Sequence, residues 1–319
     1  MSTKEKVYSL LRHSNKPISG EFLAKELNLS RTAIWKAINS LKNEGHLIQG
    51  KPNEGYFILE ESKEFNAEAI LSHLNPNNRS HVVVYETIES TNTIAKQMAE
   101  LNEPEWSLIL SKNQTKGRGR FERAFYSPFG GLYMSFIIRP SIQLNDVNLI
   151  TMNAAIAVYD AVKKYCHIDL GIKWVNDLFL DDKKVVGILT EAAIDFESKS
   201  FKYVVVGIGI NLKLSKIPND LKSIITDLNI SDDFDKNLFV AEIINNFAIN
   251  TTKSKLDIVS HYRSNSIVIN REVFISGSYS GYAKVLEITD DGELIVETKQ
   301  GEKIMLNSGE ISLRRINHE

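Results

Sequence analysis

The sequence predicts a multidomain α+β protein, and three observations lead to this fold class. At 319 residues, the chain is longer than one hydrophobic core usually extends. Apolar residues follow helical spacing in the first part, strands mix with helices in the middle, and short strands separated by tight turns end the chain. We therefore expect three domains, over residues 1–63, 64–268 and 269–319.

The first domain is predicted to open with three helices. Apolar spacing places the first over residues 4–12, Ser19 can cap the second, and Ser30 can cap the third. Asn28 marks the turn between the second helix and the third. The residues expected to face inward are Phe22, Leu23 and Leu27 in the second helix and Ile34, Ala37, Ile38 and Leu41 in the third.

Two short apolar runs follow, at residues 47–49 and 56–59, and residues 51–55 are predicted to join them as a hairpin tip. The order helix, helix, turn, helix and wing is typical of a winged helix-turn-helix, whose third helix lies in the DNA major groove. Residues 1–58 hold nine Lys and Arg against five Asp and Glu, a net charge of +4 in a chain whose total is −2. We therefore expect the first domain, and not the rest of the chain, to bind DNA.

The outward side of the third helix supplies the predicted DNA contacts. Trp35 has an alternative role, since a large aromatic side chain near a helix start often packs against its own domain. Most of the contacts are expected to position the helix rather than to read bases, and Lys51 of the wing can reach a phosphate. The predicted DNA-binding residues are Ser30, Arg31, Thr32, Trp35, Lys36 and Ser40.

The middle domain follows a polar stretch around residues 60–80, in which residues 75–80 are predicted to be a linker. A helix after residues 90–92 is expected to bury Ile94, Ala95, Met98 and Leu101. Strands mixed with helices predict an α+β sheet that helices cover. The predicted strands span residues 81–85, 106–111, 132–138, 171–174, 178–180, 185–191 and 203–210, and a long apolar helix spans residues 146–165.

Two clusters carry candidate chemistry. Residues 116–120 alternate glycine with arginine, so the bare backbone can approach an anion while guanidinium groups bind it. Residues 173–177 and 184–188 read as apolar strands that carry two lysines and an aspartate. Together they predict a site for an acyl group and a phosphate. Residues 90–92 add two hydroxyls and an amide that can hydrogen-bond a neutral carbonyl, although any of them could simply cap a helix.

These motifs occur in an order that resembles the biotin protein ligases, and with the first domain the chain resembles the bifunctional bacterial members that also repress the biotin operon. The resemblance covers nearly the whole chain. The motifs that carry it are Ser90-Thr91-Asn92, residues 114–120, Ser127-Pro128, residues 132–135, Lys173-Trp174-x-Asn176-Asp177, Lys184-x-x-Gly187-Ile188 and residues 207–211.

The resemblance implies a catalytic domain with a class II synthetase-like biotin ligase fold. It also implies that biotin and ATP are joined, with Mg²⁺, to biotinyl-5′-AMP and pyrophosphate, and that biotin then passes to one lysine of a biotin carboxyl carrier protein domain of acetyl-CoA or pyruvate carboxylase. Bound adenylate would favour a homodimer on biotin operator DNA. The alternatives left open are a lipoate or octanoate ligase on the same fold and a biotin-sensing repressor without ligase activity.

The resemblance also assigns roles to residues. A carboxylate and an α-phosphate repel each other, so cations must offset the repulsion in the first step. Asp177 would help to hold Mg²⁺ or orient the attacking amine. The implied catalytic residues are Lys184, Arg118, Arg120 and Asp177; the biotin-binding residues are Ser90, Thr91, Asn92, Gln114, Gly117, Arg118 and Lys184; and the adenylate-binding residues are Arg120, Arg123, Lys173, Asn176 and Asn211.

The glycine-rich loop over residues 116–126 is expected to be mobile when empty and to order over its ligand. Two departures from the family pattern lie near the site. Val175 stands where the family usually has proline, and residues 127–132 are one residue shorter than the usual spacing. Neither departure removes a reacting group.

The last domain is predicted to be a small SH3-like β-barrel, with strands over residues 273–275, 282–288, 294–298 and 303–306. Arg314 or Arg315 could approach ATP phosphates, or the barrel could merely support the site.

Composition narrows the setting of the protein. One cysteine excludes an internal disulfide and a cysteine metal cluster. The absence of a signal-peptide core and of an apolar run of about 18 residues predicts a cytoplasmic protein without a membrane partner.

Overall fold

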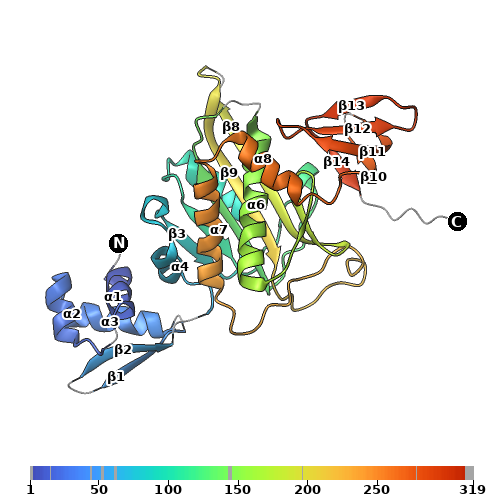
Figure 1. The fold of residues 1–319 in the computed structure, drawn as a ribbon. Coiled ribbons are helices and arrows are strands. Elements are labelled where there is room, and N and C mark those ends of the chain that lie inside the picture. The colour runs from blue at the N-terminus through green and yellow to red at the C-terminus, as the bar shows by residue number, and fades with distance from the viewer. Residues whose placement is uncertain are drawn as a thin grey trace. The chain divides into compact units, whose positions relative to one another are not determined.

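The structure, a computed structural model, divides into two units (Figure 1). The first comprises Met1–Pro76 with Ser231–Glu242, and the second comprises Asn77–Ile230 with Ile243–Glu319. The residues that the structure describes are 3–14, 16–43, 45–51, 54–60, 63–142, 146–195, 197–277 and 279–312.

The first unit has the predicted order of three helices and a two-stranded antiparallel hairpin. Ser19 Oγ accepts a hydrogen bond from Phe22 N–H (3.0 Å) and Ser30 Oγ accepts one from Ala33 N–H (3.1 Å), so both predicted helix caps are confirmed. Asn28 ends the second helix in the left-handed conformation. The elements are α1 (Thr3–Arg12), α2 (Gly20–Leu27), α3 (Arg31–Asn43), β1 (Leu47–Lys51) and β2 (Gly55–Glu60).

The core of this unit follows the predicted inward face, with one error. Leu23 and the four residues predicted on α3 are buried. Phe22, in contrast, is 52% exposed, so its predicted inward position is wrong. Successive residues of a helix point about 100° apart, and burial of Leu23 against α3 therefore turns Phe22 toward solvent.

The polar stretch after the hairpin contains a helix that the sequence did not reveal, α4 (Ala67–His73), which Asn66 caps through a hydrogen bond from Ala69 N–H (2.9 Å). Ala69 joins the core of the winged helix, and Glu68 pairs with Lys4 of α1 at 2.8 Å. A 3₁₀ turn over Pro76–Asn78 replaces part of the predicted linker. With only seven residues, α4 is too short for its apolar spacing to stand out within the polar stretch around it.

A seven-stranded sheet forms the second unit, in the order β3-β4-β5-β9-β8-β7-β6. Only β3 and β4 pair in parallel. All seven predicted strands are present, and β8 and β9 run longer than predicted. The strands are β3 (Val82–Tyr85), β4 (Leu108–Ser111), β5 (Gly131–Ile138), β6 (Gly171–Lys173), β7 (Asp177–Leu180), β8 (Lys183–Asp195) and β9 (Ser200–Asn211).

Helices cover both faces of this sheet. Thr190 and Glu191 follow each other in β8 and therefore point to opposite faces. Glu191 accepts a hydrogen bond from Asn92 of α5 (2.9 Å), whereas Thr190 meets Thr151 of α6 (2.8 Å). Figure 1 shows α6 and α8 lying together across one face. The helices are α5 (Thr91–Glu100), α6 (Val147–Cys166), α7 (Lys236–Asn250) and α8 (Lys255–Ser264).

The inward face predicted for α5 is wrong at one position. Leu101 is 80% exposed, and Ala99 is buried on that helix instead. Leu101 follows the last helical residue, so the helical spacing that placed it inward no longer applies there.

The chain ends in a five-stranded antiparallel sheet whose order is β13-β12-β11-β10-β14. It is tied to the larger sheet where Trp174 Nε1 donates a hydrogen bond to Gly292 C=O (3.0 Å). Arg314 and Arg315, predicted near ATP, lie outside the described residues. The strands are β10 (Glu272–Ser276), β11 (Gly281–Ile288), β12 (Leu294–Thr298), β13 (Lys303–Leu306) and β14 (Glu310–Ser312), of which β14 was not predicted.

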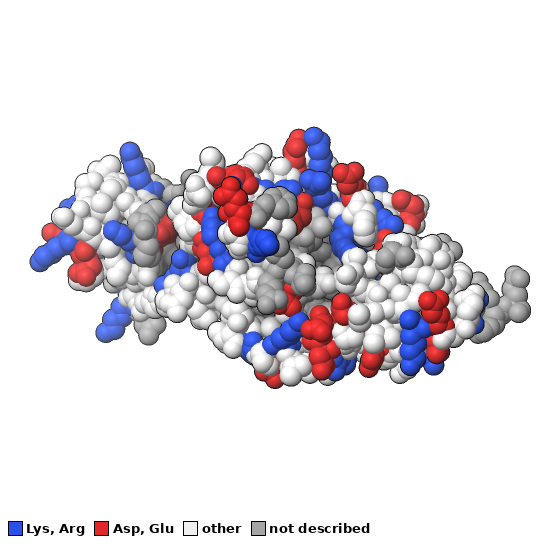
Figure 2. All heavy atoms as spheres, turned by 90° about the horizontal axis from the view of Figure 1, so that it is seen from above, with Lys and Arg blue, Asp and Glu red and all other residues white. Residues whose placement is uncertain are grey.

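Charge is mixed over the second unit. On the face that Figure 2 draws, Lys and Arg lie interspersed with Asp and Glu over this unit. Among the described residues, no helix combines the length and the apolar character that crossing a membrane requires.

Candidate active site

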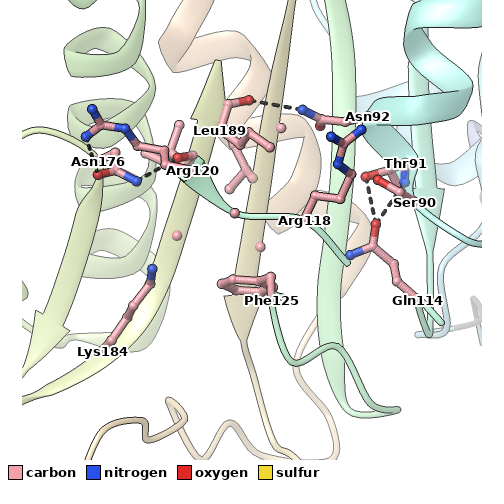
Figure 3. Close-up of a pocket in the computed structure, with 16 residues that line it drawn as sticks. Ser90, Thr91, Asn92, Gln114, Arg118, Arg120, Phe125, Asn176, Lys184 and Leu189 are labelled. Atoms are coloured by element: carbon pink, nitrogen blue, oxygen red, sulfur yellow. Dashed lines mark hydrogen bonds between the residues drawn. The ribbon is translucent and has the colours of Figure 1, made fainter. Parts of the chain in front are cut away.

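A cavity lies over the centre of the seven-stranded sheet, where β8 and β9 present three glycines (Figure 3). Its lining combines polar groups from the start of α5, cations from the glycine-rich loop, and apolar residues of the sheet. The lining residues are Ser90, Thr91, Asn92, Gln114, Arg118, Gly119, Arg120, Phe125, Asn176, Lys184, Gly187, Ile188, Leu189, Gly207, Ile208 and Gly209.

The three glycines let other side chains lie directly on the sheet. A Cβ atom at Gly207 would come within 1.9 Å of Asn92 Oδ1. At Gly209 and Gly187, a Cβ would come within 2.4 and 2.7 Å of the Phe125 ring. Any larger residue at these positions would therefore displace Asn92 or Phe125.

One end of the cavity is neutral and rich in hydrogen-bonding groups. Thr91 donates through N–H and Oγ1 to Gln114 Oε1, at 2.8 and 3.2 Å, and Gln114 Nε2 donates to Ser127 Oγ at 3.0 Å. Ser90 stands at the N-cap of α5, but its side chain makes no capping hydrogen bond. The alternative of a plain side-chain cap thus fails for Ser90, and its hydroxyl lines the cavity.

Asn92 is held by a network that the sequence did not reveal. Its amide oxygen accepts from Ser135 Oγ (2.6 Å), and its Nδ2 donates to Leu189 C=O (3.2 Å) and to Glu191 (2.9 Å), which also pairs with Lys96 (2.8 Å). Burial opposes ionisation of Glu191, but the hydrogen bonds from Lys96 and Asn92 outweigh it and lower the pKa of this carboxyl group. Because its polar atoms are already bonded, Asn92 shapes the cavity as part of a fixed scaffold.

The other end is cationic. Lys184 Nζ lies 2.6 Å from Asp177 Oδ1, and Lys173 Nζ lies 3.6 Å from Asp177 Oδ2. Burial works against the charge of Asp177, but the two ammonium groups prevail and the pKa of Asp177 falls below its ordinary value. Burial lowers the pKa of Lys173. The cluster therefore carries one net positive charge beside the cavity.

The glycine-rich loop supplies two more cations. Figure 3 shows Arg118 extending toward Asn92 and Arg120 reaching Asn176, with which it forms a hydrogen bond of 3.3 Å. Hydrogen bonds from Phe125 N–H to Gly117 C=O (2.9 Å) and from Gly119 N–H to Arg123 C=O (2.7 Å) fold the loop back on itself. Arginines from one loop thus point toward both ends of the cavity.

Phe125, which the sequence did not mark, lies between the two ends. Lys184 Nζ is 5.5 Å from the centre of its ring, and the ring packs edge-on against Tyr133. The sequence signal for Phe125 was an aromatic residue within the glycine-rich loop, three residues before Pro128.

The structure brings eight predicted site residues together in the lining and leaves five outside it. Gly117 lines a neighbouring hollow, Arg123 pairs with Glu310 of β14, and Asn211 Nδ2 donates to Thr226 C=O (2.8 Å). Asp177 and Lys173 lie behind Lys184. The eight in the lining are Ser90, Thr91, Asn92, Gln114, Arg118, Arg120, Asn176 and Lys184.

The described residues include no group of three or more His, Cys, Asp and Glu side chains that could hold a metal ion. Mg²⁺ in nucleotide sites needs only one or two carboxylates, with water and substrate phosphates as its other ligands. Asp177 fits that requirement in residue type. Two ammonium groups face its carboxylate, so Lys184 would have to move before Asp177 could bind the ion.

In the first unit, the predicted DNA-binding residues lie on α3, apart from Ser30, which precedes it. Trp35 is 57% exposed, so the alternative in which it packs within the domain is wrong. Arg31 pairs with Glu21 of α2, and Ser30 Oγ serves as the helix cap. Thr32 and Lys36 are exposed and Ser40 is partly buried. Arg31, Trp35 and Lys51 line one hollow between α2, α3 and the hairpin.

Comparison with known proteins agrees with this geometry. The family model "Biotin/lipoate A/B protein ligase family" matches residues 84–211, "HTH domain" matches residues 3–57, and "Biotin protein ligase C terminal domain" matches residues 282–314.

Relatives match over most of their length. The bifunctional ligase/repressor BirA of Bacillus subtilis is 32% identical over 304 residues, 91% of this chain and 92% of that protein. The Escherichia coli protein of the same name is 30% identical over 71% of this chain and 70% of its own. The structure of a biotin protein ligase from Aquifex aeolicus with biotin and ATP is 28% identical and superimposes with a TM-score of 0.61, covering 74% of this chain and 99% of that one. The chain therefore belongs to the biotin protein ligase family, in its group of bifunctional ligase/repressors.

Proposed function

We propose that this protein joins biotin to ATP as biotinyl-5′-AMP and passes biotin to one lysine of a biotin carboxyl carrier protein domain. The observation that carries the proposal is a single cavity with hydrogen-bonding groups and Arg118 toward one end and Arg120 and Lys184 toward the other. A neutral ring with a charged tail matches this arrangement. The match to bifunctional relatives over nine-tenths of the chain supports it.

The neutral end is the proposed place for the biotin ring system, which presents one urea carbonyl and two N–H groups. Ser90, Thr91 and Gln114 offer both hydrogen-bond donors and acceptors there. Asn92 keeps the wall in shape through its own network. Gly117 lets the loop approach, since a Cβ at this position would lie 2.4 Å from Phe125 C=O.

The cationic end is the proposed place of reaction. The biotin carboxylate attacks the α-phosphorus of ATP, and the bond to pyrophosphate breaks. Arg120 and Lys184 at this end, with Arg118 of the glycine-rich loop reaching in from the neutral end, offset the repulsion between the two anions and the charge that develops in the transition state. Bound Mg²⁺ would neutralise phosphate oxygens. Lys184 can serve both anions in turn, because it lines the cavity and only an ion pair with Asp177, outside the lining, holds it.

The second step transfers the biotinyl group. The neutral amine of the carrier lysine attacks the acyl carbon, the bond from that carbon to the AMP oxygen breaks with its electron pair leaving on AMP, and the amine gives up one proton to solvent as the amide forms. Asp177 stays ionised, because Lys184 and Lys173 favour its charged form more than burial opposes it. Its proposed role is to orient the attacking amine or to contact Mg²⁺. The other residues proposed to bind the adenylate are Arg123, Lys173, Asn176 and Asn211.

The remaining assignments concern the whole chain. We propose the three domains 1–63, 64–268 and 269–319, of which the last closes as an SH3-like barrel that supports the site. Its described contacts favour support, since Asn148 Nδ2 donates to Asn307 C=O (2.7 Å) and Glu310 pairs with Arg123. With adenylate bound, the protein would dimerise and repress genes for biotin synthesis and transport in the cytoplasm.

Mass spectrometry tests the enzymatic proposal. The protein is incubated with biotin, Mg-ATP and an acceptor carrier domain, and the intact carrier is weighed. A mass increase by one biotinyl group is expected, and its absence beside an active control ligase would sink the proposal. Lipoate in place of biotin tests the alternative ligase, since the matched family model covers both kinds. Lys184→Ala should lose most activity, whereas Lys183→Ala, an exposed neighbour, should keep it.

A further inference from the structure

Helix α8 carries a buried tyrosine that no assigned role explains. The Tyr262 side chain is 0% exposed, and its hydroxyl has no hydrogen-bond partner among the described groups. Buried polar groups in folded proteins are nearly always hydrogen-bonded, so an unpaired one calls for a reason. Phenylalanine would fill the same space without leaving a donor unpaired.

The last turn of α8 lies against the strand that carries Lys173. Ile172 N–H donates to Asn265 C=O (2.8 Å), and Ile267 N–H donates to Ile172 C=O (3.0 Å). In the next pair of strands, Lys173 stands opposite Asp177. The segment that begins with Tyr262 is therefore fastened to the edge of the sheet beside the lysine and aspartate cluster.

A matching acceptor lies in that cluster. Asp177 Oδ1 is buried and, apart from its ion pair with Lys184, makes no aligned hydrogen bond. Burial, and after it the charge of Asp177, raises the pKa of Tyr262 well above its ordinary value, while Arg120 acts in the opposite direction. Tyr262 is therefore a neutral donor at physiological pH, electrostatically coupled to both charged groups.

We propose that Tyr262 is a positioning residue for adenylate formation, whose hydroxyl donates a hydrogen bond to Asp177, directly or through one water, when Lys184 leaves Asp177 for the substrate anions. The proposal rests on the proposed function. Without Tyr262, departure of Lys184 would leave the buried Asp177 carboxylate with Lys173 alone, at 3.6 Å. A donor from Tyr262 keeps Asp177 ionised and oriented while Lys184 is engaged.

Tyr262→Phe tests the proposal, because it removes the hydroxyl and keeps the ring. Adenylate formation is followed by pyrophosphate release at saturating biotin and ATP, together with the thermal midpoint of the protein. We expect kcat to fall about 10- to 100-fold, the range for a hydrogen bond to a charged group, with KM for biotin unchanged. Tyr159→Phe, which loses a hydroxyl bonded to Asp169, is the matched control and should behave as wild type.

The same substitution in an Asp177→Asn protein distinguishes a positioning role of the Tyr262 hydroxyl from a packing role. If Tyr262 acts through Asp177, then Tyr262→Phe should lower the single-turnover rate no further in an Asp177→Asn protein. An equal fall in both backgrounds would overturn the proposal, and so would a Tyr262→Phe enzyme with wild-type kcat. A wild-type chain that forms no biotinyl-AMP would instead refute the proposed function, before any variant is compared.

Discussion

Replacing Gly207 by alanine should damage the neutral end of the cavity and leave the backbone conformation intact. The added Cβ would lie 1.9 Å from Asn92 Oδ1 and 2.7 Å from Asn92 Cγ, distances that no real contact reaches, so Asn92 must move. Moving it breaks its hydrogen bonds to Ser135, Leu189 and Glu191. Because Asn92 is buried and lines the cavity, its displacement changes the shape of the cavity.

The magnitude follows from these contacts. Overpacking a core costs about 1–3 kcal/mol, and each lost hydrogen bond costs about 0.5–1.5 kcal/mol. With three hydrogen bonds lost, we expect the second unit to lose about 2.5–7.5 kcal/mol, a fall in its thermal midpoint of about 5–30 °C for a unit of this size. Affinity for biotin should fall as well, since Asn92 forms a wall of the cavity.

Calorimetry measures both effects, by differential scanning for the unit's transition and by titration for biotin. Gly119→Ala is the matched control, because its Cβ would meet nothing closer than 3.5 Å and stability should stay within about 0.5 kcal/mol of wild type. A Gly207→Ala protein with unchanged midpoint and biotin affinity would refute the placement of Asn92 on the sheet.

Three further outcomes can be checked. The pKa of Asp177 in the folded protein lies below the unfolded value of about 4, so its ionised carboxylate should stabilise the fold above that pH. This stabilisation is lost as the pH falls through the folded pKa. The thermal midpoints of wild type and Asp177→Asn should therefore converge only below about pH 4. The loop over residues 116–126 should resist limited proteolysis with biotin and ATP and be cut without them; equal cleavage would contradict ligand-driven ordering. Lys36→Ala should weaken operator binding evenly across sequences and lower the salt slope by about 1, whereas an unchanged slope would remove Lys36 from the phosphate contacts.

The sequence predicted the elements of the fold well, because their apolar spacing is regular. It failed where one residue had to be placed at an element's end or edge. Phe22 and Leu101 follow the apolar pattern but face solvent, and α4, with seven residues, is too short to be recognised. Tertiary contacts decide these positions, and spacing along the chain does not report them.

Within the site, residue types were predictable and their pairings were not. The sequence singled out the two lysines and the aspartate. It did not show that the register of β7 and β8 shifts between Leu178 and Phe179. This shift places Lys184 opposite Phe179, and the Lys184 ammonium group still reaches Asp177. No local pattern encodes such a bulge. Ser135 belongs to the motif over residues 132–135 and is a polar residue in a mainly apolar strand. A polar residue in such a strand was the sequence signal for its buried hydrogen bond to Asn92.

The two ends of the cavity are built differently, and this difference has a kinetic consequence. Asn92, Ser135 and Glu191 form a buried network in which hydrogen bonds are already satisfied, so the neutral end is organised before any ligand arrives. Lys184 and Arg120 are instead held by contacts that substrate anions can replace, an ion pair with Asp177 and a long hydrogen bond to Asn176. Changes at the neutral end should therefore act mainly on KM for biotin, because they alter a fixed shape. Changes at the cationic end should act mainly on kcat, because Lys184 and Arg120 must exchange partners before the carboxylate and the phosphate can meet.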